Sequence, residues 1–183
     1  MRLLSGHVGL TLVELLVVIA LLSLLQSLAV PAFADLASSM RLTAAVNTLV
    51  SSLTLARSEA IKRNARTVVC KSSDGVICTK VGGWEQGWLV FHDPNNNVAL
   101  DSGETVVLRV AALSNGVRLT GNDPLVHYVS FTPLGKPQYM SGAFQAGRLT
   151  ACPQADRPVP ARQIVISSSG RLRTLRTQVD SCP

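Results

Sequence analysis

The sequence predicts an α+β protein in which one long N-terminal helix packs on a head of antiparallel β-sheets. A nearly uncharged apolar segment comes first, apolar residues at helical spacing follow it, and short β-type runs separated by turn residues begin at Arg66. The length of 183 residues suits one membrane-anchoring helix and one modest domain. It disfavours a two-domain enzyme.

The apolar segment covers residues 10–30, LTLVELLVVIALLSLLQSLAV, and carries a single charge, on Glu14. A helix of that length spans about 30 Å, which is close to the hydrocarbon thickness of a bilayer. We therefore expect it to cross a membrane. It is either a lasting anchor or a secretory signal peptide, and Ala32-Phe33-Ala34 has the small-x-small form of a leader-peptidase site.

Glu14 bears on that choice. A carboxylate inside a membrane segment makes insertion less favourable by a few kcal/mol, so its presence indicates a partner group or a function. If the chain were cut between Gly9 and Leu10, the new α-amino group of Leu10 would lie four residues from Glu14. The apolar run is also longer than the roughly 7–15 residues of a usual signal-peptide core. Both points disfavour the signal-peptide interpretation.

Gly9-Leu10-Thr11-Leu12-Val13-Glu14 resembles the type III signal of type IV prepilins and type II secretion pseudopilins. The resemblance implies that prepilin peptidase removes a leader ending at Gly9. It also implies that Leu10 becomes the N-methylated first residue and that Glu14 is critical for assembly. Pro31 matches the family's helix-kinking proline.

Residues 40–64 place apolar side chains at steps of three and four, which predicts an amphipathic helix. The apolar stripe consists of Leu42, Val46, Leu49, Leu53, Ala56 and Ala60. The opposite face carries Arg41, Asn47, Ser51, Arg57, Lys62 and Arg63. We expect the stripe to pack on the protein's own sheet, and a helix lying on a membrane surface is the alternative.

Seven short β-type runs follow, punctuated by turn pairs such as Asp74-Gly75 and Asn115-Gly116. The runs are residues 67–71, 87–92, 105–111, 117–120, 126–132, 162–167 and 171–179. Because no helical crossover separates them, we expect antiparallel rather than parallel sheets.

The chain has four cysteines, all beyond the apolar segment: Cys70, Cys78, Cys152 and Cys182. No CxxC pair or His-rich cluster indicates zinc, and we predict no metal site and no cofactor. Exported cysteines usually form disulfides. Three connectivities are possible, and proximity favours Cys70–Cys78 with Cys152–Cys182. Four reduced, buried cysteines are the alternative.

The head shows a second resemblance, carried by residues 70–78, by the tryptophan-rich run at 84–91 and by the Asp-Asn loop that ends at 101–104. These residues resemble the GspH/FimT group of minor pilins and pseudopilins. The resemblance implies a type IV pilin-like fold, with a leader at 1–9, a transmembrane and assembly segment at 10–35 and a head at 36–183. It also implies a single-pass inner-membrane protein with a periplasmic head, later assembled with other pilins or pseudopilins into a filament.

Residues 93–104 place oxygen side chains at the first, third, fifth, ninth and twelfth positions, as a calcium loop does. Val98 stands where an EF-hand needs glycine, and strands rather than helices are expected on either side, so we interpret the loop as a solvated hairpin loop. His92 and His127 have no recognisable catalytic partner motif, and no phosphate-binding loop is present. We therefore predict a protein that is not an enzyme.

Positive charge concentrates near the C-terminus. From Lys136 onward seven basic residues face two acidic ones, which accounts for +5 of the net charge of +6. Nucleic acid, an anionic membrane and an acidic protein are all candidate partners. The basic residues are Lys136, Arg148, Arg157, Arg162, Arg171, Arg173 and Arg176.

Gly170-Arg171-Leu172-Arg173 is the strongest candidate for a binding motif. On a strand the two arginines would share one face about 6.6 Å apart, close to the spacing of successive phosphates, and arginine forks suit phosphate oxygens. The run matches the Gly-Arg-x-Arg motif of FimT-like minor pilins, which bind DNA in natural transformation. The resemblance assigns DNA binding to Arg171 and Arg173, with Gly170 shaping the turn. Charge alone adds Arg176, Arg162, Arg148 and Lys136.

Three functions compete at this point. The first is a FimT-like minor pilin that binds extracellular DNA through its backbone, with little dependence on sequence. The second is a GspH-like pseudopilin of a type II secretion system, in which the arginines are solvated or pair with acidic residues of a neighbouring subunit. The third is a periplasmic enzyme or calcium-binding module.

Overall fold

The computed structural model describes residues 11–114, 116–155 and 158–182. These residues form helix α1 (Leu12–Arg63), a short 3-10 helix η1 (Trp84–Gln86) and eight strands. The chain divides into two compact units, residues 1–39 and 40–183, and α1 contributes residues to both. The predicted leader, including Gly9, and the predicted first mature residue Leu10 lie outside the described residues.

In the N-terminal unit α1 begins with a capping box. Glu14 Oε2 accepts hydrogen bonds from Thr11 N and Thr11 Oγ1 at 2.9 and 3.1 Å, and Thr11 Oγ1 accepts one from Glu14 N at 3.2 Å. The Oγ atoms of Ser23 and Ser27 donate to carbonyls three residues earlier. This part of α1 is long and apolar enough to cross a membrane, judged by length and composition alone.

The first sheet has the strand order β3-β2-β1-β5, with every neighbouring pair antiparallel. Its strands are β1 (Thr67–Lys71), β2 (Trp88–His92), β3 (Val106–Val110) and β5 (Tyr128–Phe131). All five residues of β1 and all five of β2 are buried. This sheet therefore holds the most deeply buried strands of the head.

The second sheet has the order β4-β6-β7-β8 and is also antiparallel throughout. Its strands are β4 (Val117–Gly121), β6 (Gly147–Pro153), β7 (Val159–Ile166) and β8 (Leu172–Val179). Strand β8 is an edge strand, so one of its sides has no strand partner in the described part of the chain.

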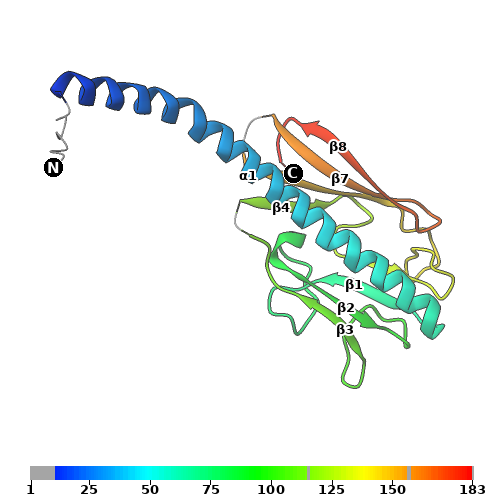
Figure 1. The fold of residues 1–183 in the computed structure, drawn as a ribbon. Coiled ribbons are helices and arrows are strands. Elements are labelled where there is room, and N and C mark those ends of the chain that lie inside the picture. The colour runs from blue at the N-terminus through cyan, green and yellow to red at the C-terminus, as the bar shows by residue number, and fades with distance from the viewer. Residues whose placement is uncertain (1–10, 115, 156–157, 183) are drawn as a thin grey trace, which may run out of the picture. The chain divides into compact units, whose positions relative to one another are not determined.

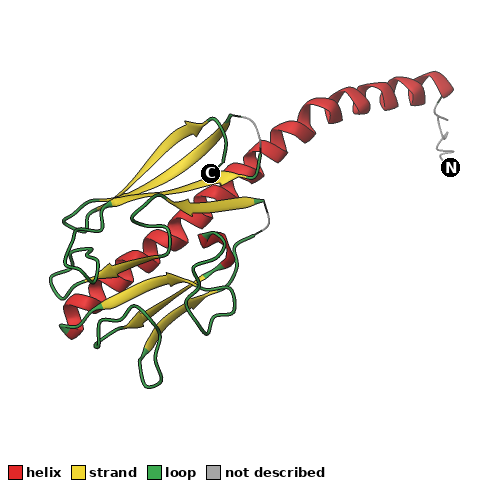
Figure 2. Cartoon of the chain, turned by 180° about the vertical axis from the view of Figure 1, so that it is seen from behind, coloured by secondary structure: helices red, strands yellow, loops and turns green. Residues whose placement is uncertain are grey.

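Both sheets share one hydrophobic core with the second half of α1. All six residues of the predicted apolar stripe are at most 3% exposed, and they pack with Val69 and Val90 of the first sheet and with Leu149 and Ile164 of the second. Figure 1 shows this half of α1 running across the strands, and Figure 2 shows the two sheets from behind. The prediction that the stripe packs on its own domain is confirmed.

The predicted fold class is confirmed, with three differences in its elements. The apolar segment and the amphipathic segment form one helix, which continues through Pro31. Strand β6 was not predicted, and β7 begins at Val159 rather than at Arg162. Arg171 precedes β8, which begins at Leu172, so the prediction that Arg171 lies on the strand is wrong.

The structure contains the two disulfides that proximity favours, and it has no free cysteine among the described residues. Cys70–Cys78 closes a loop on the first sheet. Cys152–Cys182 joins β6 to the segment that follows β8, and it packs in a small apolar cluster with Val159 and Ala161.

Candidate nucleic-acid interface

The strands of the second sheet carry positive charge and no negative charge. Strands β4, β6, β7 and β8 contain five arginines and not one aspartate or glutamate. Within the described residues, none of these arginines has a carboxylate within ion-pair distance, because every ion pair there involves Glu59 of α1. The five are Arg118, Arg148, Arg162, Arg173 and Arg176.

The strand register divides these arginines between the two faces of the sheet. Arg173 lies opposite Val165, and Val165 lies opposite Arg148, so these residues share one row. The row lies on the face turned away from α1, because the alternate residues Leu149 and Ile164 belong to the core. Arg173 and Arg148 are both exposed. With one strand between them, they lie about 10 Å apart across the sheet.

Arg162 and Arg176 lie on the opposite face. They are directly paired across β7 and β8, and Arg162 also lies opposite the core residue Ala151. Together with Asn47 of α1 they line a cavity of about 280 Å³. The predicted set of arginines is therefore not a single patch, since these two point toward the helix side.

The turn between β7 and β8 holds Arg171. Gly170 N donates to Ser167 O at 2.8 Å, Ser167 N donates to Arg171 O at 3.1 Å, and Arg171 N donates to Ser167 Oγ at 3.0 Å. The backbone of Arg171 is thereby fixed while its side chain is exposed. Leu172 is half-buried and packs against the core, as expected for the residue between the two arginines.

A second turn, at residues 132–136, packs against this one. Gly170 has φ of +79°, and a Cβ built on it would lie 2.3 Å from Gly135 O, so only glycine fits here. Lys136, next to Gly135, is exposed. The prediction that Gly170 shapes the turn agrees with this geometry.

Arg57 of α1 donates hydrogen bonds to the β7–β8 turn and lies beside Gly135 of the other turn. Its Nη1 donates to Gly170 O at 3.0 Å and its Nη2 to Ser169 O at 3.3 Å. A Cβ built on Gly135 would lie 3.0 Å from Arg57 Nε. Sequence reasoning placed Arg57 on the polar face of the helix and gave it no role. Its hydrogen-bond partners are 112 and 113 residues away in the sequence, so no local sequence pattern could predict the contact.

Four exposed cations thus gather at one end of the second sheet: Lys136, Arg148, Arg171 and Arg173. This end contains the β7–β8 turn, the start of β6 and the end of β4, as the register requires. Arg118, which the sequence analysis did not select, lies on the same outer face but opposite Cys152, toward the other end. The arrangement can hold several phosphates through bidentate guanidinium contacts.

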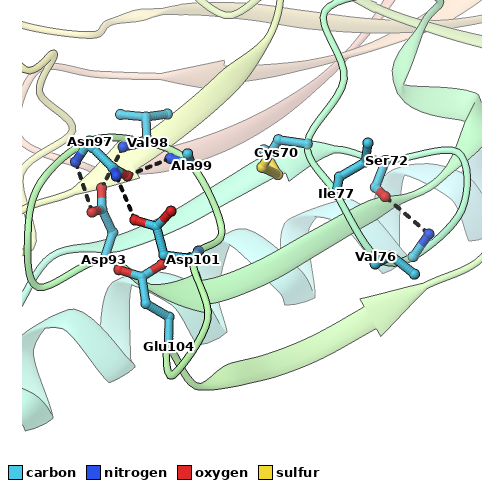
Figure 3. The surroundings of a disulfide bond; sticks show 12 residues. Cys70, Ser72, Val76, Ile77, Asp93, Asn97, Val98, Ala99, Asp101 and Glu104 are labelled. Carbon is cyan, nitrogen blue, oxygen red and sulfur yellow. Dashed lines mark hydrogen bonds between the residues drawn. A yellow bond between two sulfur atoms is a disulfide. The ribbon is translucent and has the colours of Figure 1, made fainter.

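The loop at 93–104 uses its acidic groups to hold its own backbone (Figure 3). The buried Asp93 accepts from Asn97 N at 2.9 Å and Val98 N at 3.0 Å, and Glu104 accepts from Asp101 N at 3.1 Å. Val98 adopts φ of +61°, the left-handed conformation for which an EF-hand uses glycine. Burial, together with the neighbouring charges of Asp93 and Asp101, raises the pKa of Glu104. Among the described residues, no three His, Cys, Asp or Glu side chains are arranged to hold a metal ion.

The two histidines that the structure describes have different surroundings. His92 Nδ1 lies 3.1 Å from Thr67 Oγ1, and His92 Nε2 lies 3.4 Å from Glu59 Oε2. Burial, and then the positive charge of Arg63, lower the pKa of His92. His127 is exposed at the rim of an apolar cavity of about 590 Å³ beside the Cys70–Cys78 disulfide.

A long apolar N-terminal helix whose second half packs on an antiparallel head defines a type IV pilin-like protein. The fold is similar to that of the type IV minor pilin FimU of Pseudomonas aeruginosa, in two crystal forms. The TM-score is 0.56 at 18% identity for both, over 78% of this chain and 95% or 100% of FimU.

The family model described as type II transport protein GspH matches residues 45–170. The chain is also 32% identical over 173 residues to the pilin-like protein PilA1 of Thermus thermophilus, covering 90% of this chain and 96% of PilA1. The protein belongs to the GspH family of pilins and pseudopilins. It is thus a pilin-like subunit of a kind that assembles with other pilins, and its family is structural rather than catalytic. The matched range ends at Gly170, so β8 lies beyond it.

Proposed function

We propose that this protein is a minor type IV pilin whose head binds DNA through the end of its second sheet. The observation that carries the proposal is the gathering of Lys136, Arg148, Arg171 and Arg173, all exposed, at one end of a sheet whose strands have no acidic residue. Arg171 and Arg173 make the primary phosphate contacts. Arg148 and Lys136 extend the positive surface on either side.

Phosphate contacts dominate the binding we propose. No aromatic side chain occurs in β6, β7 or β8, so base stacking has no platform there. Guanidinium groups without carboxylate partners lose no ion pair when they bind phosphate. Binding is therefore directed at the backbone and tolerant of sequence, and its affinity falls steeply as salt rises.

The register supplies a matched test. In one variant Arg171 and Arg173 are both replaced by Gln, and in the other Arg162 and Arg176 are replaced in the same way. Both variants remove two positive charges. The first removes them from the exposed turn before β8 and from the outer face of β8, and the second removes them from the helix-side face of β7 and β8. Binding of the full-length protein, in non-ionic detergent, to a labelled DNA duplex is followed by fluorescence anisotropy at several salt concentrations.

We expect the Arg171→Gln, Arg173→Gln variant to bind all sequences more weakly. The slope of log affinity against log salt concentration should become less steep by the amount that roughly two phosphate contacts contribute, with each contact contributing about 0.9 to the slope. The Arg162→Gln, Arg176→Gln variant should keep most of the affinity. No DNA affinity in the wild type at low salt, or equal losses in the two variants, would refute the proposed site.

The competing function is that of a type II secretion pseudopilin without DNA binding, which the description of the matching family model favours. In that case the arginines face acidic residues of a neighbouring subunit. A wild-type protein that binds its partner pilins but not DNA would establish this alternative.

We also propose the processing that the N-terminal residues imply. Prepilin peptidase cuts between Gly9 and Leu10, the new amine becomes methylated, and α1 anchors the subunit in the inner membrane with a periplasmic head before assembly. Sequencing of the mature N-terminus tests this proposal. A mature chain that begins at Asp35 would instead establish a cleaved signal peptide.

A further inference from the structure

Three segments far apart in the sequence meet beneath the proposed DNA site. They are α1 at Arg57, the 132–136 turn at Gly135 and the β7–β8 turn at Gly170. The exposed cations Lys136 and Arg171 each follow one of the two glycines directly. Whatever holds the glycines together therefore also sets the separation of the backbone positions that carry the two cations.

Arg57 makes contacts that can hold the two turns together. Its guanidinium donates to two successive carbonyls of the β7–β8 turn, Gly170 O at 3.0 Å and Ser169 O at 3.3 Å. Its Nε is buried and has no hydrogen-bond partner among the described residues. The side chain is half-buried, unlike those of Arg171 and Lys136, so it faces the turns rather than a ligand in solvent.

We propose that Arg57 is a positioning residue of the DNA site: it clamps the β7–β8 turn against the 132–136 turn and so presents Arg171 and Lys136 at a fixed spacing. This inference rests on the proposed function. Two hydrogen bonds from a rigid, planar fork fix the direction of the turn as well as its distance from the helix. Guanidinium groups that are already held in place lose less entropy when they bind phosphate.

The first test replaces Arg57 with Met, which keeps most of the aliphatic stem and removes both donors. The control is Arg41→Met, which removes the same charge from an exposed arginine of the same helix. Arg41 lies sixteen residues, or about 24 Å, from Arg57 along α1. Its guanidinium lies near Gly116, at the opposite end of the second sheet.

We measure two quantities on the full-length protein in detergent: DNA affinity by anisotropy, and amide hydrogen exchange of the peptide that contains residues 167–173. Arg57→Met should weaken DNA binding by about fivefold or more and speed exchange in this peptide, since two charge-assisted hydrogen bonds are lost. Arg41→Met should change the affinity less than about twofold and leave the exchange as it is.

A second variant disturbs the same contact without removing charge. In Gly170→Ala the new Cβ would lie 2.3 Å from Gly135 O and 3.2 Å from Arg57 Nε, which forces the three segments apart. Its control is Gly103→Ala, where φ is also positive, at +98°, but nothing lies within 4 Å of the new Cβ. Gly170→Ala should weaken DNA binding, and Gly103→Ala should not.

The outcomes separate this inference from the proposed function. If the wild type does not bind DNA, the proposed function fails and the positioning role falls with it. If the wild type binds DNA and Arg57→Met and Gly170→Ala bind equally well, only the positioning role is refuted. Weaker binding by Arg57→Met with unchanged exchange would mean that Arg57 acts through its charge alone, which also refutes the positioning role.

Discussion

The two disulfides allow a matched measurement of how the C-terminal strand is held. Each pairs one fully buried cysteine, Cys70 or Cys152, with one half-buried partner, Cys78 or Cys182. Replacing both cysteines of a pair with alanine therefore removes similar amounts of buried sulfur in the two cases. The difference between the two double variants reports mainly the size of the loop that each bridge closes.

The loops differ almost fourfold in length, with sequence separations of 8 and 30 residues. Loop-closure entropy assigns about 2.5 kcal/mol to the shorter loop and about 3.6 kcal/mol to the longer one. The Cys152→Ala, Cys182→Ala variant should therefore be less stable than the Cys70→Ala, Cys78→Ala variant by about 1 kcal/mol. The longer bridge also spans the outer face of β7, so its loss should loosen the end of β8.

Urea unfolding measures this difference. Trp84 and Trp88 are both fully buried in the core and serve as the fluorescence probe. With an m-value of about 2 kcal/mol per molar, the two unfolding midpoints should differ by about 0.5 M. A lower midpoint for the Cys70→Ala, Cys78→Ala variant would refute the loop argument. Equal midpoints would show that β8 is held by strand pairing rather than by the bridge.

Two further predictions concern single side chains. Because burial lowers the pKa of His92 in the folded protein, protonation favours the unfolded chain. The contribution of His92 to the free energy of unfolding is therefore complete above the ordinary histidine pKa of 6.5 and is lost as the pH falls through the folded-state pKa. His92→Gln should flatten this pH dependence, measured by urea unfolding between about pH 7.5 and 5. Glu14→Gln keeps an acceptor for the capping box but removes the charge, whereas Glu14→Ala removes both. Both variants should insert into the membrane and fail to enter filaments if the charge pairs with an α-amine, whereas normal incorporation of Glu14→Gln alone would show that the cap suffices.

Much of the fold could be predicted from local sequence patterns, but strand β6 could not. Strand β6 contains Gly147 at its start and Pro153 at its end, with Ala151 and Cys152 in its second half, which is a weak β signal. It is nevertheless an interior strand, paired with β4 on one side and β7 on the other. Its conformation is set by these partners rather than by intrinsic propensity.

The start of β7 was missed for a related reason. Pro160 interrupts a strand pattern because it has no N–H to donate. In the structure the pairing with β6 ends at Arg162, so Pro160 has a partner on one side only, Gln178 of β8. A proline is tolerated where a strand lacks one neighbour.

The candidate site was partly predictable as well. Alternation along β8 separates Arg173 from Arg176, and that division follows from the sequence alone. The face of Arg162 depends on the register between β7 and β8, which no local rule supplies. The contact of Arg57 with Gly170 depends on how the helix packs on the sheet, and hydrophobic periodicity does not specify which polar residue comes to lie over the turn.

Arginines on β8 have a second consequence, because β8 is an edge strand. Exposed edges pair with other strands unless charge prevents it, and Arg173 and Arg176 supply that charge on both faces. Replacing arginines here with neutral residues therefore removes two properties at once, phosphate binding and protection of the edge. Lysine keeps the charge and the protection but loses the bidentate fork. An Arg171→Lys, Arg173→Lys variant should accordingly stay monodisperse in detergent and keep only part of the DNA affinity. Full affinity in that variant would show that charge alone suffices, and none of the affinity would then belong to the geometry of the guanidinium groups.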